Sequence, residues 1–117
     1  MTSARILAAV LLAAAALTAW GAEPSVPSAG QLLGSCKVGD MSCTDFEKAV
    51  GPGAREACQK YKLTWSPLAC SDQKVVGTCV KSEGGGRSFT HSYAPATAEI
   101  ARKACTNTPG GVFVPRA

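Results

Sequence analysis

Apolar and polar positions divide the chain into an uncharged N-terminal stretch, a short spacer and a longer region of mixed pattern. The fifteen residues 6–20 carry no charge and consist mainly of alanine and leucine. This length is typical of a signal peptide and is shorter than the roughly 20 apolar residues that span a membrane. We therefore expect a signal peptide over residues 1–21 and no transmembrane span after its cleavage. Residues 22–33, rich in proline, serine and glycine, are expected to form a flexible linker.

Strands are predicted where β-branched residues cluster or where apolar and polar side chains alternate. Residues 74–80 and 88–93 have these patterns, and the glycines between them predict a hairpin turn over residues 83–87. Alternation over 88–93 places Phe89, His91 and Tyr93 on one face of the strand and Thr90 and Ser92 on the other. Shorter strands are expected at residues 63–65 and 112–114.

Helices are predicted where small apolar residues recur at helical spacing. A short helix after Pro52 would direct one stripe toward the core, and a second helix would run from Pro95 to about Cys105. Thr44 and Glu47 have the spacing of a capping box, which favours a helical turn there. The core-facing stripe of the first helix comprises Ala54, Ala57, Cys58 and Tyr61.

Two parts of the chain resemble each other. The sequence A-R-E-A-C at residues 54–58 recurs as A-R-K-A-C at residues 101–105. Flanking matches occur in the same order: G-S-C with G-T-C, Phe46 with Tyr93, and Trp65 with Phe113. We infer two degenerate repeats, residues 34–70 and 77–117, within one disulfide-rich domain over residues 34–117. Each repeat would contain strand, strand, helix and strand, which predicts a small α+β domain with helices packed on an antiparallel sheet.

The six cysteines all follow the signal peptide. An even number of cysteines behind a secretory signal indicates disulfides in an oxidising compartment. Zinc sites use cysteine pairs two to four residues apart, whereas Cys36 and Cys43, the closest pair, are separated by six residues and His91 is the single histidine. No C-x-x-C redox motif is present, so neither a metal nor another cofactor is expected.

The repeat also predicts how the cysteines pair. Cys79 and Cys105 are the two cysteines of the second repeat and should bond to each other. By equivalence Cys36 should bond to Cys58, which leaves Cys43 and Cys70 as the third pair.

A lipoprotein is the alternative interpretation of Cys36. Leu33-Gly34-Ser35-Cys36 has the form of a lipobox, which would make Cys36 the lipid-bearing first residue of an outer-membrane lipoprotein. However, Glu23 and two prolines separate this motif from the hydrophobic segment that a lipobox should follow directly. The repeat also assigns Cys36 a structural disulfide.

Charge excludes some partner classes. Without the signal peptide the chain has eleven basic and eight acidic residues, and the two signs alternate without forming a cluster. A nucleic-acid or anionic-lipid site would need basic residues gathered on one face. We therefore expect no nucleic-acid binding.

Candidate catalytic residues are few. His91 could act as a general base, but no motif brings a nucleophile and an orienting carboxylate to it. We interpret it as a surface or interface histidine and predict no enzymatic activity. Gly84–Gly86 lacks the P-loop pattern, and Trp65 and Phe113 are interpreted as core aromatics. The remaining candidates for surface binding are Arg55, Arg87 and Arg102.

The G-T-C strand at residues 77–79, the helix motif at 101–105 and the closing G-G-V-F-V-P at 110–115 resemble short Cys-rich exported proteins of Gram-negative bacteria. Members of this group are often described as hypothetical proteins or lipoproteins. The resemblance implies export and disulfides, and it implies no activity for any residue.

Three functions are compatible with these patterns. The first is a non-enzymatic exported protein, periplasmic or secreted, that binds a protein or envelope partner. The second is an inhibitor or effector that presents rigid loops at residues 84–87 and 66–72. The third is a small hydrolase that uses His91.

Overall fold

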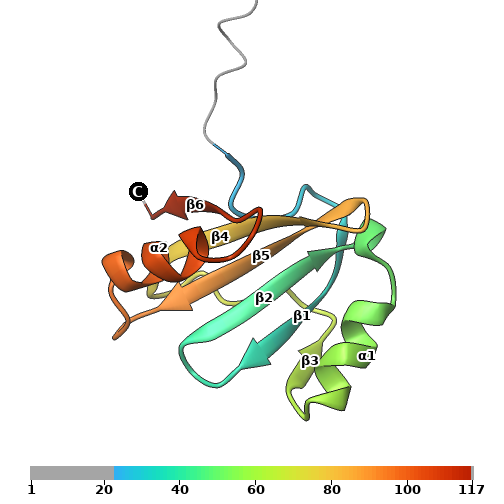
Figure 1. Ribbon diagram of the computed structural model, residues 1–117. Helices are drawn as coiled ribbons and strands as arrows, with labels where there is room; N and C mark the ends of the chain where they lie inside the picture. The colour runs from blue at the N-terminus through green and yellow to red at the C-terminus, as the bar shows by residue number, and fades with distance from the viewer. Residues whose placement is uncertain (1–22, 117) are drawn as a thin grey trace, which may run out of the picture.

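One antiparallel sheet forms the centre of the molecule (Figure 1). The computed structural model describes residues 23–116, so the expected signal peptide lies outside the described residues. The six strands are arranged in the order β3-β1-β2-β5-β4-β6. Their bounds are β1 Leu32–Val38, β2 Ser42–Glu47, β3 Thr64–Ser66, β4 Val75–Glu83, β5 Gly86–Tyr93 and β6 Val112–Pro115.

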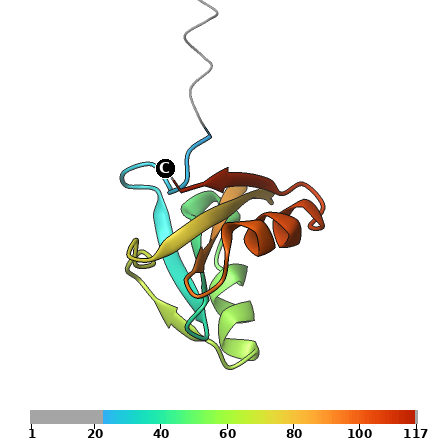
Figure 2. The same ribbon diagram turned by 90° about the vertical axis from the view of Figure 1, so that its left-hand side faces the viewer.

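Two helices, α1 (Gly53–Lys60) and α2 (Ala98–Thr106), and a 3-10 turn, η2 (Lys48–Val50), complete the fold. Both α-helices lie on one side of the sheet, which we call the helix face, as seen in front of the strands in Figure 1 and to their right in Figure 2. The prediction of a small α+β domain with helices on an antiparallel sheet is confirmed.

The two halves of the domain have the same order of elements. Residues 32–66 and 75–115 each form strand, strand, helix and strand. The halves meet where β2 pairs with β5, and at this junction Thr44 lies opposite Thr90 with their hydroxyl oxygens 2.9 Å apart. β1 begins at Leu32, two residues inside the stretch expected to be a linker.

Three disulfides hold the elements together, and they join the pairs expected from the repeat. Cys36–Cys58 connects β1 to α1, and Cys79–Cys105 connects β4 to α2. Cys43–Cys70 connects β2 to the segment between β3 and β4 on the opposite side of the sheet. Because the Cys36 sulfur is bonded to Cys58, it cannot also carry a lipid.

Two local predictions are wrong. Thr44 and Glu47 lie in β2, where pairing with β1 and β5 replaces the expected helical turn. The second helix begins at Ala98 and not near Pro95, because the side chain of Thr97 accepts a hydrogen bond from the amide of Ile100 and so caps the helix there.

The aromatic matches in the repeat divide into two kinds. Trp65 and Phe113 lie on opposite edge strands, and each covers a glycine of its own half, Gly34 and Gly77 respectively, where a β-carbon would overlap the ring. Phe46 and Tyr93 are not equivalent in space. The pairing of Thr44 with Thr90 sets the register, so Phe46 faces the helices, whereas Tyr93 faces the other side.

Candidate functional site

The segment that connects β3 to β4, residues 67–74, crosses the sheet on the side opposite the helices. We call this segment the strap and the side that it crosses the strap face (Figure 2). Its side chains are exposed except for that of Cys70, which is half-buried. Leu68 retains 72 % of its accessible surface, the largest fraction among the exposed large apolar residues of the described chain. The strap therefore presents an apolar side chain to solvent.

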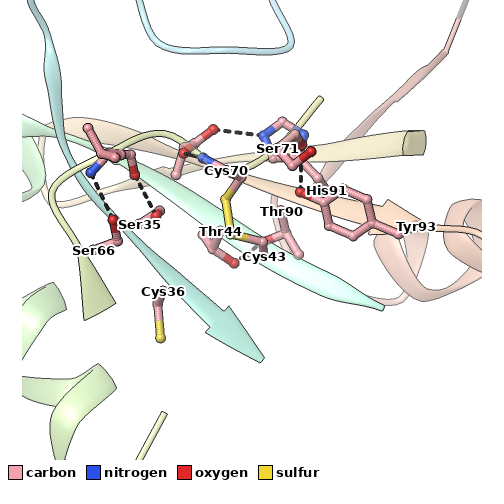
Figure 3. The surroundings of a disulfide bond; sticks show 12 residues. Ser35, Cys36, Cys43, Thr44, Ser66, Cys70, Ser71, Thr90, His91 and Tyr93 are labelled. Carbon is pink, nitrogen blue, oxygen red and sulfur yellow. Dashed lines mark hydrogen bonds and ion pairs between the residues drawn. A yellow bond between two sulfur atoms is a disulfide. The ribbon is translucent and has the colours of Figure 1, made fainter. Parts of the chain in front are cut away.

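The centre of the strap is fixed at Cys70. Its sulfur is bonded to Cys43 of β2, and its backbone N–H donates a hydrogen bond of 2.8 Å to Oδ1 of Asp45 (Figure 3). Asp45 is fully buried. One covalent and one charge-assisted contact thus hold the same residue against the sheet.

Side chains of the sheet also bind the strap on both sides of Cys70 (Figure 3). The hydroxyl of Ser35 donates to the carbonyl of Leu68 at 2.7 Å, and the hydroxyl of Tyr93 donates to the carbonyl of Ser71 at 2.8 Å. Burial, followed by the nearby charges of Asp45 and Asp72, raises the pKa of Tyr93, which keeps the phenol protonated as a donor.

A chain of hydrogen bonds runs across three strands beneath the strap. Nε2 of His91 is 2.8 Å from Oδ2 of Asp45, and Nδ1 of His91 is 2.7 Å from Oγ1 of Thr78. An ionised carboxylate accepts hydrogen bonds and does not donate them, so Nε2–H donates to Asp45. In the neutral imidazole, Nδ1 is then the acceptor for the Thr78 hydroxyl. We call Thr78, His91 and Asp45 the relay.

The burial of the relay changes the interpretation of His91. His91 and Thr78 retain 4 % and 3 % of their accessible surface. The prediction of a surface histidine is therefore wrong, because the strap covers the face that it shares with Phe89 and Tyr93. The relay joins β4, β5 and β2 and, through Asp45, reaches the amide of Cys70. Its evident structural effect is to position the strap.

Asp45, Cys70 and His91 do not form a suitable metal site. Ligand atoms of Asp45, Cys70 and His91 lie within 4.8 Å of one another. However, the Cys70 sulfur is in a disulfide and cannot act as a thiolate ligand. Asp45 and His91 already use the facing atoms in their mutual hydrogen bond.

Two cavities flank the strap. One of about 520 Å³ lies between the strap and the β1–β2 hairpin. The other, of about 280 Å³, has Thr78 and His91 among its lining residues and is bordered by Val26, Ser71 and Arg116. The relay therefore borders a space on one side of the strap, although its own atoms are almost fully covered.

The candidate arginines lie away from the relay. Arg87 forms two side-chain hydrogen bonds with Glu47, at 2.9 and 3.1 Å, and these bonds lower the pKa of Glu47. Arg102 lies over the ring of Phe113, 4.8 Å from its centre, and Arg55 is exposed on α1. The Gly84–Arg87 turn is thus tied to the sheet at Arg87, and the strap is the more exposed of the two loops predicted to bind.

Asp45 is the functional residue that sequence reasoning missed. It precedes His91 by 46 residues, and the two meet because β2 pairs with β5. The local signal was the alternation of β2, in which Cys43, Asp45 and Glu47 are all buried on the strap face.

Within residues 23–116, no helix has the length and apolar character needed to cross a membrane. No protein-family model, no curated protein and no solved structure matches this chain.

Proposed function

We propose that this chain is an exported, non-enzymatic binding protein that recognises a partner protein with its strap. One observation carries the proposal: the strap exposes its side chains while its backbone is held at Leu68, Cys70 and Ser71. Leu68 would enter an apolar pocket of the partner. The neighbouring polar side chains of the strap would form the rim of the contact.

Rigidity is what makes the strap suited to binding. A flexible loop loses conformational entropy when a partner immobilises it, and this cost reduces affinity. The disulfide and the side-chain hydrogen bonds restrict the strap before any partner arrives. Its backbone therefore loses less entropy on binding than that of an unanchored loop.

The geometry also favours one mode of recognition. The N–H of Leu68 donates to Oγ of Ser66 at 3.0 Å, and its carbonyl accepts from Ser35. With both backbone groups already bonded, Leu68 is poorly suited to pair as an added strand with a partner's sheet. Recognition would rely on side chains, which argues against a loop that binds a protease as its substrates do.

Export is supported by the cysteine chemistry. All six cysteines are paired, and such disulfides persist in the periplasm or outside the cell. The expected signal peptide and the resemblance to short Cys-rich exported proteins point the same way. An envelope-associated role fits the same location, because the partner protein would attach this domain to the envelope.

Site-specific photocrosslinking in the native host tests this function. A photoreactive residue placed at Leu68 should crosslink to one discrete protein, and the same residue at Ile100 should not. Ile100 is a matched control because it is apolar, 63 % exposed and located on α2. Equal crosslinking from both positions, or none from position 68, would reject the strap as the recognition element.

A hydrolase is the second candidate, because the relay links a hydroxyl, an imidazole and a carboxylate in the order that catalytic triads use. We rank the hydrolase second because Thr78 is almost completely buried. In an ester-hydrolysis assay, Thr78→Val removes the hydroxyl and keeps the shape. If the wild-type protein hydrolyses the ester and the folded variant does not, the protein is a hydrolase. Equal rates for the two proteins would remove it.

A further inference from the structure

A groove crosses the helix face between α1 and α2. It consists of two neighbouring cavities of about 510 and 320 Å³, and Thr44, Phe46 and Glu83 line both of them. The sheet forms its floor at the junction of β2 and β5. In Figure 1, β2 and β5 run between the two helices.

Small side chains of both helices line this groove. Ala54 and Ala57 border the larger cavity, and Ala101 and Ala104 border the smaller one. The stripe on α1 was predicted to face the core. However, Cys58 is the one buried residue of α1, and Tyr61, which directly follows the helix, is 70 % exposed. Protein interiors are normally close-packed, whereas Ala57 and Ala104 stay exposed beside the two cavities.

A buried serine lines the smaller cavity of the groove. Ser88 of β5 lies on the helix face, retains 5 % of its accessible surface and lines the smaller cavity. Within the part of the chain that the structure describes, its hydroxyl has no protein hydrogen-bond partner. Buried polar groups are nearly always hydrogen-bonded, so Ser88 has an unused donor and acceptor where a ligand could reach it.

The two ends of the groove differ in chemistry. The α1 end is mainly apolar: Val38, Phe46, Val50 and Leu63 line it besides the alanines, together with Thr44 and Glu83. The α2 end carries the hydroxyls of Ser88, Thr90, Ser92 and Thr108. Lys81 and Glu83 also line this end, 3.8 Å apart, and together they are neutral.

We propose that the groove binds a single-chain amphiphile with an uncharged polyol head. The acyl or alkyl chain would lie along α1, and the head would exchange hydrogen bonds with Ser88 and its neighbouring hydroxyls. An apolar site of several hundred cubic ångströms with a few convergent polar groups is typical of small-molecule binding sites. This site lies on the face opposite the strap, so it does not depend on the function proposed for the strap.

Octyl glucoside, titrated below its micelle-forming concentration into isotope-labelled protein, is the probe. Amide NMR shifts should change along β2, β5 and the facing sides of both helices and leave the strap unchanged. Octanoate should bind more weakly because its charge has no unpaired cation at the α2 end, and glucose alone should not bind. Shifts that are absent, or that centre on the strap, would overturn the proposal.

Three variants locate the ligand. Ser88→Ala should weaken binding about fivefold by removing one hydrogen bond. Ala57→Leu should fill the apolar end and abolish binding of the probe. Gln59→Leu, on the outer side of α1, should leave binding unchanged. Leucine has a high helix propensity, so neither substitution should disturb α1 itself. If Ala57→Leu and Gln59→Leu bind the probe equally, the groove is not the site.

Discussion

At the scale of single residues, Asp45 is the point where the strap and the sheet are joined. Its two carboxylate oxygens accept from different partners, Oδ1 from the amide of Cys70 and Oδ2 from His91. Because Asp45 is fully buried, water cannot replace either partner. Both oxygens of this buried side chain are thus hydrogen-bonded, as buried polar groups nearly always are.

Asp45→Ala should therefore lower the free energy of unfolding by about 2–4 kcal/mol, since it leaves the buried His91 ring and the part-buried Cys70 amide without their acceptor. Urea denaturation measures this change. Asp40→Ala is the control: its side chain is 99 % exposed, and the expected change is within about 0.5 kcal/mol. Similar losses in the two variants would contradict the role given to Asp45.

The pairing of Glu47 with Arg87 predicts that the free energy of unfolding depends on pH. Its hydrogen bonds from the Arg87 side chain hold its pKa below the ordinary value of 4.5 in the folded protein. A carboxyl group with a lowered folded-state pKa contributes stability above its unfolded-state pKa, and this contribution is lost as the pH falls through the folded-state value. Unfolding free energies measured from pH 6 downward should therefore fall more steeply below about pH 4.5 in the wild type than in Glu47→Gln. Parallel curves for the two proteins would show that the pair has no such effect.

At the scale of elements, each disulfide has a separate task. Two of them attach one helix each to the sheet, and Cys43–Cys70 attaches the strap. Removing one should therefore loosen one element and leave the others in place.

Replacing Cys43 and Cys70 together with serine should lower the free energy of unfolding by about 3.5 kcal/mol, the value expected for a closed loop of this length. The far-UV circular dichroism of the helices should remain, because their own disulfides are intact. Replacing Cys36 and Cys58 instead should reduce the helical signal. Loss of all structure in the first variant would show that the strap is not a separate element.

Gly77, which lies beneath the ring of Phe113, gives a further test of packing. Gly77→Ala should destabilise the domain, since the new β-carbon would overlap the ring of Phe113. Gly53→Ala should be neutral or stabilising by about 0.5–1 kcal/mol, because it lies in α1 with open space around it. Thermal denaturation compares the two, and a Gly77→Ala protein as stable as Gly53→Ala would contradict the observed packing.

At the scale of the whole molecule, the sheet separates two surfaces with different properties. The strap face has a rigid, exposed segment over a buried polar network, and the helix face has an open groove between two helices. The order of elements in the second half was predictable, because alternation, helical spacing and the positions of glycine and proline are local signals. In the first half, the spacing of Thr44 and Glu47 predicted a helical turn where the structure has β2. The alternation of residues 88–93 also predicted which side chains share a face with His91.

The contents of the site were less predictable, because they depend on pairing between distant strands. Nothing near His91 in sequence indicates Asp45, and nothing near Cys70 indicates that its amide reaches a buried carboxylate. The open groove was missed for a similar reason: a stripe of small residues has the same pattern whether it packs against the sheet or borders a space. The duplication that suggested the disulfide pairs stays a prediction.

We infer that the strap backbone is held rigid before it meets a partner, and hydrogen exchange at the Cys70 amide measures this rigidity. This amide lies in an exposed connecting segment, yet it donates to the buried Asp45. NMR of the isolated protein should show exchange slowed to near the rate of the central strands. Exchange as fast as that of an unstructured peptide would show that the strap is mobile and that this protein does not present a preformed binding surface.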